Sequence, residues 1–235
     1  MTIAKYLFAQ APAITAILSA WFIALLAQRL SRWMVKRIRA ELAAFEPHVP
    51  LLALPVQTMT HWFTVWLVIN AGWLALITRI DAGYLAGSIV LLAVLGVLAM
   101  VDAQTGILPN ELILLSMIIV LACVWQVSST WLPAQTFLWG MTLGYGIPTL
   151  FNAAYRLIYD TDALGQGDAK LLAVLGLWLG IYALADVWLI ACALLLVYTA
   201  VKRCQCKNEF GLKSSMPFGP FLVLAANVVF IYGLA

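Results

Sequence analysis

Charged residues are scarce in this sequence, because aspartate, glutamate, lysine and arginine together make up only 10% of its 235 residues. Hydrophobic residues make up 65%, whereas soluble domains carry roughly 45–50% apolar and about 25% charged residues. With a mean hydropathy of +1.00, this composition excludes an ordinary soluble globular protein. The apolar stretches are too many and too long to be one signal peptide, so the sequence predicts a single helical bundle embedded in a membrane.

Histidine and cysteine are also rare, with two and four residues. Cys123 and Cys192 fall within apolar stretches and are interpreted as packing residues, and no structural disulfide is expected. A zinc site of Cys204-Gln205-Cys206 with His48 and His61 is an alternative, but its Cys-x-Cys spacing differs from the usual pattern, and we expect no metal. The net charge of +3 does not indicate nucleic-acid binding, because the cations stand at the ends of apolar stretches.

Eight segments are interpreted as membrane helices, which need roughly 20 mostly apolar residues each. They cover residues 11–28, 62–78, 82–101, 111–127, 135–155, 169–184, 186–201 and 217–234. An N-terminus outside the cell leaves all but two of the 13 lysines and arginines, Lys5 and Arg79, on the inner side, as positive charges prefer. The prediction is an all-α polytopic bundle of about eight transmembrane helices, in which the sixth and seventh helices meet near Asp186.

Two carboxylates stand at the edges of apolar segments, where a charge costs free energy and indicates a function. Asp102 follows segment 82–101, and Asp168 closes the run Gly165-Gln166-Gly167-Asp168 ahead of segment 169–184. Two predicted crossings separate the two aspartates, so both are expected at the cytoplasmic face of the membrane. Close carboxylates that share one proton supply both the acid and the base for peptide hydrolysis.

The helix ends favour a division of roles within this pair. Asp168 begins a helix, whose positive end favours its anion, and Asp102 ends one, whose negative end favours its protonated form. The resulting hypothesis makes Asp168 the base and Asp102 the acid. Gly165 and Gly167 are expected to adopt backbone angles that other residues resist and to let a substrate strand approach. A flexible loop that ends in an N-capping aspartate is the alternative without catalysis.

Four ordered segments resemble the type IV prepilin peptidases, a family of membrane aspartic proteases of the Gly-x-Gly-Asp type. The segments are Asp102 with Leu108-Pro109-Asn110, Gly144-Tyr145, the stretch from Gly165 to Gly180, and Met216-Pro217-Phe218-Gly219-Pro220-Phe221. The resemblance covers about residues 82–234. It implies a six-span peptidase domain over 82–235, with Asp102 and Asp168 as the catalytic residues and no cofactor for proteolysis.

The resemblance also implies a substrate and a location. Such enzymes cleave the basic leader from prepilins or pseudopilins at the cytoplasmic face of the bacterial inner membrane. The expected partners are therefore the prepilin, the lipid bilayer and the pilus or type II secretion machinery, and no nucleic acid. A presenilin-type protease that cuts within a substrate helix is one alternative, since it also carries Gly-x-Gly-Asp. A non-enzymatic transporter or assembly scaffold is the other.

The N-terminal region, residues 1–81, departs from this family. Many members carry two zinc-binding Cys-x-x-Cys pairs in the first cytoplasmic loop, and they methylate the new N-terminus with S-adenosylmethionine. The corresponding loop, 29–61, contains no cysteine. We therefore interpret 1–81 as a two-span region with a shortened loop and no zinc knuckle, and N-methyltransferase activity is in doubt.

Residues around the pair are further candidates. Lys170, two residues after Asp168, either tunes the charge of the pair or extends to the membrane interface. Glu111, Asp160 and Asp162 are candidates to attract a basic leader, and stabilisation of a helix start is the structural alternative for them. The candidate substrate-binding residues are Glu111, Asp160, Asp162, Pro217, Phe218 and Gly219.

Overall fold

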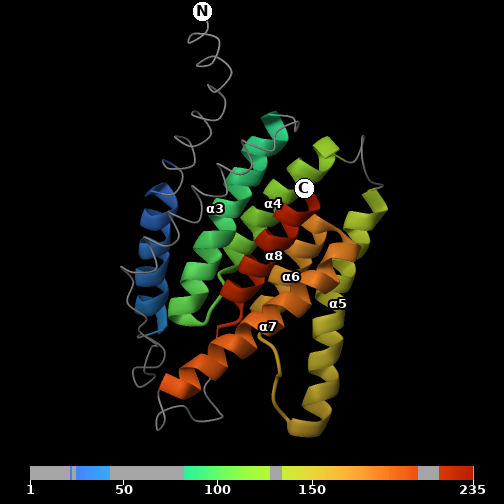
Figure 1. Cartoon of the computed structure of the whole chain (residues 1–235). Coiled ribbons are helices and arrows are strands. Elements are labelled where there is room, and N and C mark those ends of the chain that lie inside the picture. Colours follow the sequence, from blue (N-terminus) through green and yellow to red (C-terminus); the bar gives the residue numbers. More distant parts are fainter. Residues whose placement is uncertain (1–21, 23–24, 43–81, 128–133, 206–216, 235) are drawn as a thin grey trace, which may run out of the picture.

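The computed structural model describes residue 22 and residues 25–42, 82–127, 134–205 and 217–234. As predicted, the regular structure in these ranges is helical, and no strand occurs within them. A helix over 25–42 is followed by α3 (Ala82–Thr105), α4 (Asn110–Val127), α5 (Ala134–Tyr159), α6 (Gln166–Leu179), α7 (Ile181–Gln205) and α8 (Gly219–Leu234) (Figure 1). The predicted segments 11–28 and 62–78 lie mostly or wholly outside the described residues.

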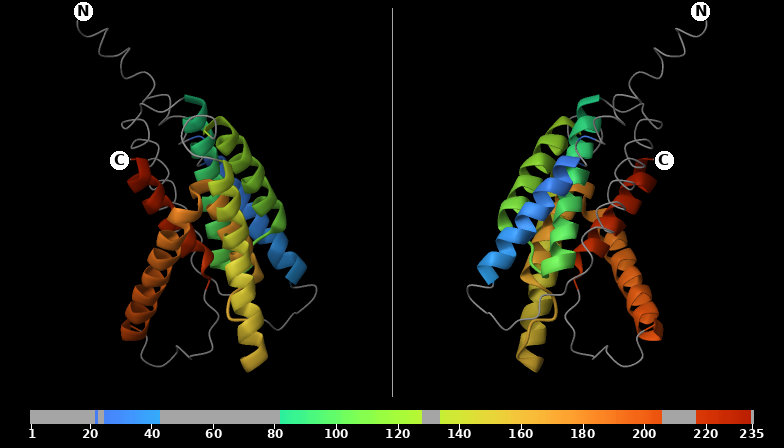
Figure 2. Two further views of the ribbon diagram at one scale, coloured as in Figure 1. Left: turned by 90° about the vertical axis from the view of Figure 1, so that its right-hand side faces the viewer. Right: turned by 90° about the vertical axis from the view of Figure 1, so that its left-hand side faces the viewer.

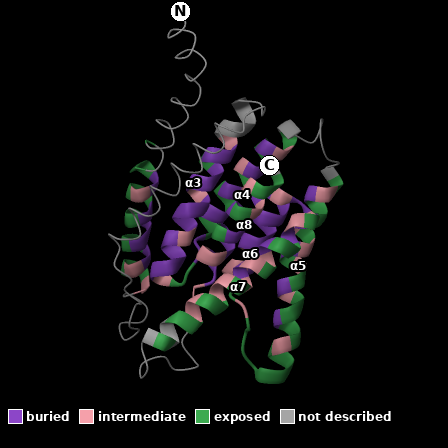
Figure 3. Ribbon diagram, in the orientation of Figure 1, coloured by how far each residue is buried: buried purple, intermediate pink, exposed green. Residues whose placement is uncertain are grey.

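Helix α6 lies at the centre of the bundle and contacts α4, α5, α7 and α8. Residues 171–178 are all buried, and Figure 3 shows the buried residues concentrated on α3, α6 and α8. A helix that is apolar on every side is stable only where neighbours cover it. Burial of the apolar α6 therefore places its first turn, which contains Asp168, at the end of the bundle.

Helices α5 and α6 cross with their backbones in contact at Gly140 and Gly176. A Cβ atom on either glycine would overlap the carbonyl group of the other, and a Cβ atom on Gly144 would lie 2.5 Å from the Leu172 carbonyl oxygen. Small residues four positions apart allow this approach, as the spacing of Gly140 and Gly144 indicates. The two helices consequently pack more closely than side chains with a Cβ atom would permit.

The break between the sixth and seventh helices falls at Gly180, so the prediction of a break near Asp186 was wrong. Gly180 has a φ of +83°, and its N–H donates to the Gly176 carbonyl oxygen at 2.9 Å. Positive φ at a helix C-terminus favours glycine. Asp186 lies inside α7 and is exposed. The backbone conformation of Gly180, six residues before Asp186, ends the helix.

Two helices in the described part of the chain are long and apolar enough to cross a membrane, Gly87–Thr105 in α3 and Ile181–Val201 in α7. The α3 segment is 83% buried inside the protein, but the α7 segment is only 17% buried. Figure 2 shows α7 and α5 diverging toward one end of the bundle. The exposed apolar face of α7, which includes Leu189 and Leu196, fits a lipid environment. The all-helical architecture and these two apolar helices are consistent with a helical membrane protein.

Candidate functional site

Asp102 is buried in the last turn of α3, where only 4% of its surface is exposed. Helix α3 runs on to Thr105 and ends at Gly106, which has a φ of +65°. The Oδ2 atom of Asp102 accepts a hydrogen bond of 2.9 Å from the backbone N–H of Gly219. Gly219 begins α8, and the first N–H groups of a helix lack partners within the helix. Asp102 therefore ends one helix and caps the positive end of another.

Gly219 fits beside Asp102 because it has no side chain. A Cβ atom at this position would lie 2.7 Å from Oδ2 and 3.1 Å from Cγ of Asp102. Sequence reasoning grouped Pro217, Phe218 and Gly219 as substrate contacts. Phe218 is 6% exposed and lies in the apolar core, Pro217 is half-buried, and Gly219 contacts the carboxylate. The motif thus positions Asp102, and substrate contact by Pro217 stays a prediction.

Asp168 lies in the first turn of α6, which begins two residues earlier than predicted, at Gln166. It precedes the apolar segment 169–184 and lies outside the two helices that can cross a membrane. Its Oδ1 atom is buried without a hydrogen-bond partner. Burial and, to a smaller extent, the negative charge of Asp102 raise the pKa of Asp168 to about 7, although the Gly165 backbone acts to lower it. The two carboxylates thus lie close enough to interact electrostatically.

This raised pKa runs against the direction predicted from the helix start. The helix dipole stabilises a nearby anion by about 0.3–1 kcal/mol at exposed positions. Desolvation is the largest cause of the shift at Asp168, because a buried carboxylate with an unpartnered oxygen loses hydration that one N-terminal turn does not replace. The surroundings of Asp168 therefore favour its protonated form near neutral pH.

The glycines of the Gly165-Gln166-Gly167-Asp168 run provide room rather than unusual backbone angles. Gly165 has a φ of −61° and a ψ of 141°, which other residues also adopt, so the expectation of special angles was wrong for Gly165. A Cβ atom on Gly167 would lie 2.9 Å from Cβ of Leu108, and one on Gly165 would lie 3.1 Å from Oδ2 of Asp168. These glycines let the start of α6 pack against Leu108 and the carboxylate.

The loop between α5 and α6 is attached to α5 by Asn152, a residue that sequence reasoning missed. Its Nδ2 donates to the Leu164 carbonyl oxygen at 2.6 Å, and its Oδ1 accepts from the N–H groups of Ala163 at 3.1 Å and Leu164 at 2.8 Å. A buried amide in an apolar helix indicates a specific role, and that pattern was present in the sequence.

Asp160 and Asp162, the candidate leader-binding residues of this loop, have structural partners. The Arg156 guanidinium donates to both carboxylate oxygens of Asp162, with Nη2 2.7 Å from Oδ2 and Nε 3.0 Å from Oδ1. Asp160 has a φ of +57°, and its N–H donates to the Arg156 carbonyl oxygen at 3.0 Å. This left-handed conformation and hydrogen bond terminate α5. Both residues are exposed, so they shape the loop while their binding of a leader stays a prediction.

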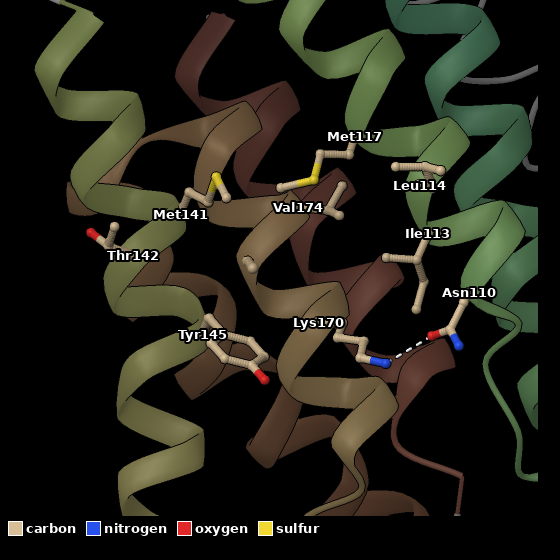
Figure 4. A pocket seen from close by; sticks show the side chains of 10 residues that line it. Asn110, Ile113, Leu114, Met117, Met141, Thr142, Tyr145, Lys170 and Val174 are labelled. Atoms are coloured by element: carbon tan, nitrogen blue, oxygen red, sulfur yellow. Dashed lines mark hydrogen bonds between the residues drawn. The ribbon is translucent and has the colours of Figure 1, made fainter.

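Lys170 points toward Asn110 and lines a groove between α4, α5 and α6 (Figure 4). Its Nζ donates to Oδ1 of Asn110 at 2.7 Å. The groove has a volume of about 460 Å³, and its other lining residues are mostly apolar, including Met117 and Met141. Glu111, the residue after Asn110, is exposed in the first turn of α4. The charge of Lys170 therefore faces the groove and Asn110, and direct tuning of the pair by Lys170 stays a prediction.

No group of three or more histidine, cysteine or acidic side chains that could hold a metal occurs among the described residues. Cys204 is exposed near the end of α7. Cys206, His48 and His61 lie outside the described ranges, so the alternative zinc site is not tested. The expectation of no metal and no cofactor stays a prediction.

A buried and a half-buried carboxylate that interact at one end of a helical bundle define a class of site suited to acid–base chemistry. The sequence model of the Type IV leader peptidase family matches residues 89–200, which include both aspartates. Over this segment the chain is similar to the type IV leader peptidase family. The resemblance read from the sequence motifs is thereby confirmed.

Relatives with curated names agree. The chain is similar to a prepilin leader peptidase/N-methyltransferase of Dickeya chrysanthemi, with 33% identity over 141 residues, which cover 60% of this chain and 48% of the relative. A protein of the same name from Aeromonas salmonicida is 27% identical over 201 residues, 86% of this chain and 64% of the relative. The chain spans about half the length of the Dickeya relative. No solved structure matches the chain.

Proposed function

We propose that this chain is a membrane aspartic endopeptidase that removes the basic leader from prepilins or pseudopilins, with Asp102 and Asp168 as its catalytic pair. The observation that carries the proposal is the electrostatic interaction between the buried carboxylate of Asp102 and the half-buried carboxylate of Asp168, inside the segment that matches the leader peptidase family. A structural role alone does not account for a buried, unpartnered oxygen on Asp168, because such an atom costs stability unless substrate or water uses it.

The surroundings of the two aspartates support a division of labour that reverses the one expected from helix ends. The Gly219 N–H and the start of α8 stabilise negative charge on Asp102, which takes a proton from the attacking water. Asp168, protonated near neutral pH, donates its hydrogen to the substrate carbonyl oxygen. The water oxygen bonds to the carbonyl carbon and forms a tetrahedral intermediate with two hydroxyl groups. The C–N bond then breaks, the amide nitrogen leaves with the proton that Asp102 received, and one hydroxyl returns its proton to Asp168 as the carboxylic acid forms.

The proposal includes an eight-span topology with the N-terminus outside and the active site facing the cytoplasm of a bacterial inner membrane. Two observations support it. The last turn of α3 and the first turns of α6 and α8 meet at one end of the bundle, as two complete crossings by α4 and α5 would require. The distribution of lysine and arginine favours the cytoplasm for that end.

The proposed substrate is a prepilin or pseudopilin, and the proposed partners are the pilus or type II secretion machinery of the same membrane. The relatives are named for N-methyltransferase activity as well. For this chain the cysteine-free loop 29–61 supports a peptidase without the zinc knuckle, and methylation from S-adenosylmethionine stays in doubt. Methyl transfer from labelled S-adenosylmethionine to a cleaved pilin would overturn that part.

Incubation of the purified protein with a prepilin, followed by mass analysis, tests the function directly. The expected product lacks the basic leader and begins just before the apolar segment. Asp102→Asn and Asp168→Asn should each lower kcat by at least about 10³-fold, because the two carboxylates act as a unit. Asp186→Asn is the matched control, since Asp186 is an exposed carboxylate on α7 outside the pair.

The outcomes separate the alternatives. A cut inside the apolar segment would indicate a presenilin-type protease instead. Full cleavage by either aspartate variant would reject the proposed catalytic pair. Absence of any cleavage by a folded wild-type protein would favour a transporter or assembly scaffold, in which buried carboxylates serve as an ion path.

A further inference from the structure

Asn152 is a buried polar residue in the C-terminal half of α5, and only 8% of its surface is exposed. A buried amide costs free energy unless its donors and acceptors find partners. Asn152 finds three partners, and all of them are backbone groups of Ala163 and Leu164. Its side chain therefore holds a segment that lies more than ten positions further along the chain.

The residues that Asn152 holds come directly before the start of α6. Leu164 is followed by Gly165, whose carbonyl oxygen accepts hydrogen bonds from the N–H groups of Asp168 at 3.1 Å and Ala169 at 3.3 Å. These bonds form the first turn of the helix. A continuous series of contacts thus runs from the Asn152 amide through Leu164 and Gly165 to the backbone of Asp168.

Arg156 lies one turn after Asn152 and provides a second contact to the same loop. Residues four apart lie on one face of a helix, and Arg156 pairs with Asp162 as Asn152 pairs with Leu164. The Arg156–Asp162 pair is exposed, however. Exposed ion pairs contribute only about 0–1 kcal/mol, so the buried amide is the stronger attachment.

We propose that Asn152 is a positioning residue for the cleavage reaction: its amide fixes residues 163–164 against α5 and thereby places the Asp168 carboxylate beside Asp102. The kinetic part of this inference rests on the proposed peptidase function. Asn152 touches neither aspartate side chain in the described hydrogen bonds, so its effect is transmitted through the backbone of the loop.

Removal of the amide has two expected consequences. A displacement of about 1 Å at a reacting group lowers the rate about 100-fold, so Asn152→Ala should lower kcat by about 10- to 100-fold while KM changes by less than about twofold. The loosened loop also admits water to Asp168, which lowers its pKa. Because Asp168 acts in its protonated form, the alkaline limb of the kcat profile should move to lower pH.

Thr149→Ala is the matched control, since Thr149 lies nearly one turn before Asn152 on α5. Its hydroxyl donates only to carbonyl oxygens of its own helix, those of Tyr145 and Gly146. This change removes a polar group from the same helix without touching the loop. The control should keep the kcat and the pH profile of the wild type.

Asn152→Asp is the second variant, in case the alanine variant does not fold. The aspartate keeps the two acceptor contacts with backbone N–H groups, and in its protonated form it also donates to the Leu164 carbonyl oxygen. Its kcat should therefore approach that of the wild type as the pH is lowered, whereas Asn152→Ala stays reduced at every pH.

The experiment uses the full chain in phospholipid nanodiscs, with a prepilin as substrate and isotope-edited infrared spectra to titrate Asp168, whose band is assigned with Asp168→Asn. A lowered Asp168 pKa and a lowered kcat in folded Asn152→Ala support the proposal. If Asn152→Ala folds and keeps the Asp168 pKa and the kcat of the wild type, the proposal is overturned. If Asn152→Ala does not fold, the proposal is overturned when Asn152→Asp keeps both wild-type values throughout the pH range. If wild-type protein cleaves no prepilin, the proposed function fails, and the titration alone decides whether Asn152 positions Asp168.

Discussion

Asp102 and Asp168 are held in different ways at the same end of the bundle. Asp102 is locked between two helices, with one oxygen bonded to the Gly219 N–H and no space for a Cβ atom at that glycine. Asp168 begins a helix whose preceding loop is attached by one buried amide, and its Oδ1 has no partner. The comparison indicates that Asp102 is the rigidly held member of the pair, and that Asp168 is the member tuned by its surroundings.

Among changes that leave both carboxylates in place, the largest effect is expected from Gly219→Ala, which disturbs the rigidly held Asp102. The added Cβ atom would lie 2.7 Å from the Asp102 carboxylate and would break its hydrogen bond. Hydrogen bonds to charged groups contribute about 1.5–3 kcal/mol, and about 1.4 kcal/mol corresponds to a tenfold change in rate. The rate of leader cleavage should fall about 10- to 150-fold.

Gly233→Ala serves as the control, because Gly233 also lies in α8 and a Cβ atom there meets nothing within 4 Å. Steady-state cleavage of a prepilin, together with thermal unfolding, measures both variants. Equal rates for Gly219→Ala and wild type would contradict the assigned contact between Gly219 and Asp102.

The pH profile tests which aspartate gives the proton. Burial raises the pKa of Asp168 to about 7, and its protonated form is proposed to act as the acid. The protonated fraction falls as the pH rises through that value, so kcat/KM should decline about tenfold per pH unit on the alkaline side. If kcat/KM stays constant to high pH and declines only at low pH, the result would contradict Asp168 as the acid and would favour Asp102 in that role.

Gly165→Ala tests the surroundings of Asp168 and should lower the rate of leader cleavage less than Gly219→Ala does. The new Cβ atom would lie 3.1 Å from Oδ2 of Asp168, a tight distance that a shift of a few tenths of an ångström relieves. A change of about 1 kcal/mol would lower the cleavage rate about fivefold. A loss as large as that of Gly219→Ala would show that the two sides are equally rigid.

The smallest effect is expected from Asp162→Asn, which removes the exposed ion pair with Arg156. Pairs of this kind contribute about 0–1 kcal/mol and are screened by salt, so the unfolding temperature should change little and cleavage should stay within about twofold of wild type. A large loss of cleavage without loss of stability would support leader binding by Asp162 instead.

The sequence predicted the parts of this structure that depend on local pattern. The apolar segments gave helices close to α3, α4, α5 and α8, and the two aspartates were selected because a carboxylate at the edge of an apolar segment is costly. Each of these inferences needs only neighbours within a few turns of one helix.

The remaining features depend on long-range contacts and on solvation. The contact of Gly219 with Asp102 joins residues 117 positions apart, and no local pattern specifies which backbone N–H reaches a carboxylate at that range. The helix dipole gave the wrong direction for Asp168 because desolvation, which depends on the complete bundle, is the larger influence. The sequence shows Asn152 as a polar residue within an apolar segment, but it does not specify the loop, residues 163–164, that the Asn152 amide contacts.

Helices α5 and α6 are joined at both ends, by the Gly140–Gly176 crossing at one and by Asn152 with Leu164 at the other. Two attachments at opposite ends of a helix pair resist a change in the angle between α5 and α6. A rotation of α5 would consequently carry the start of α6, and Asp168 with it.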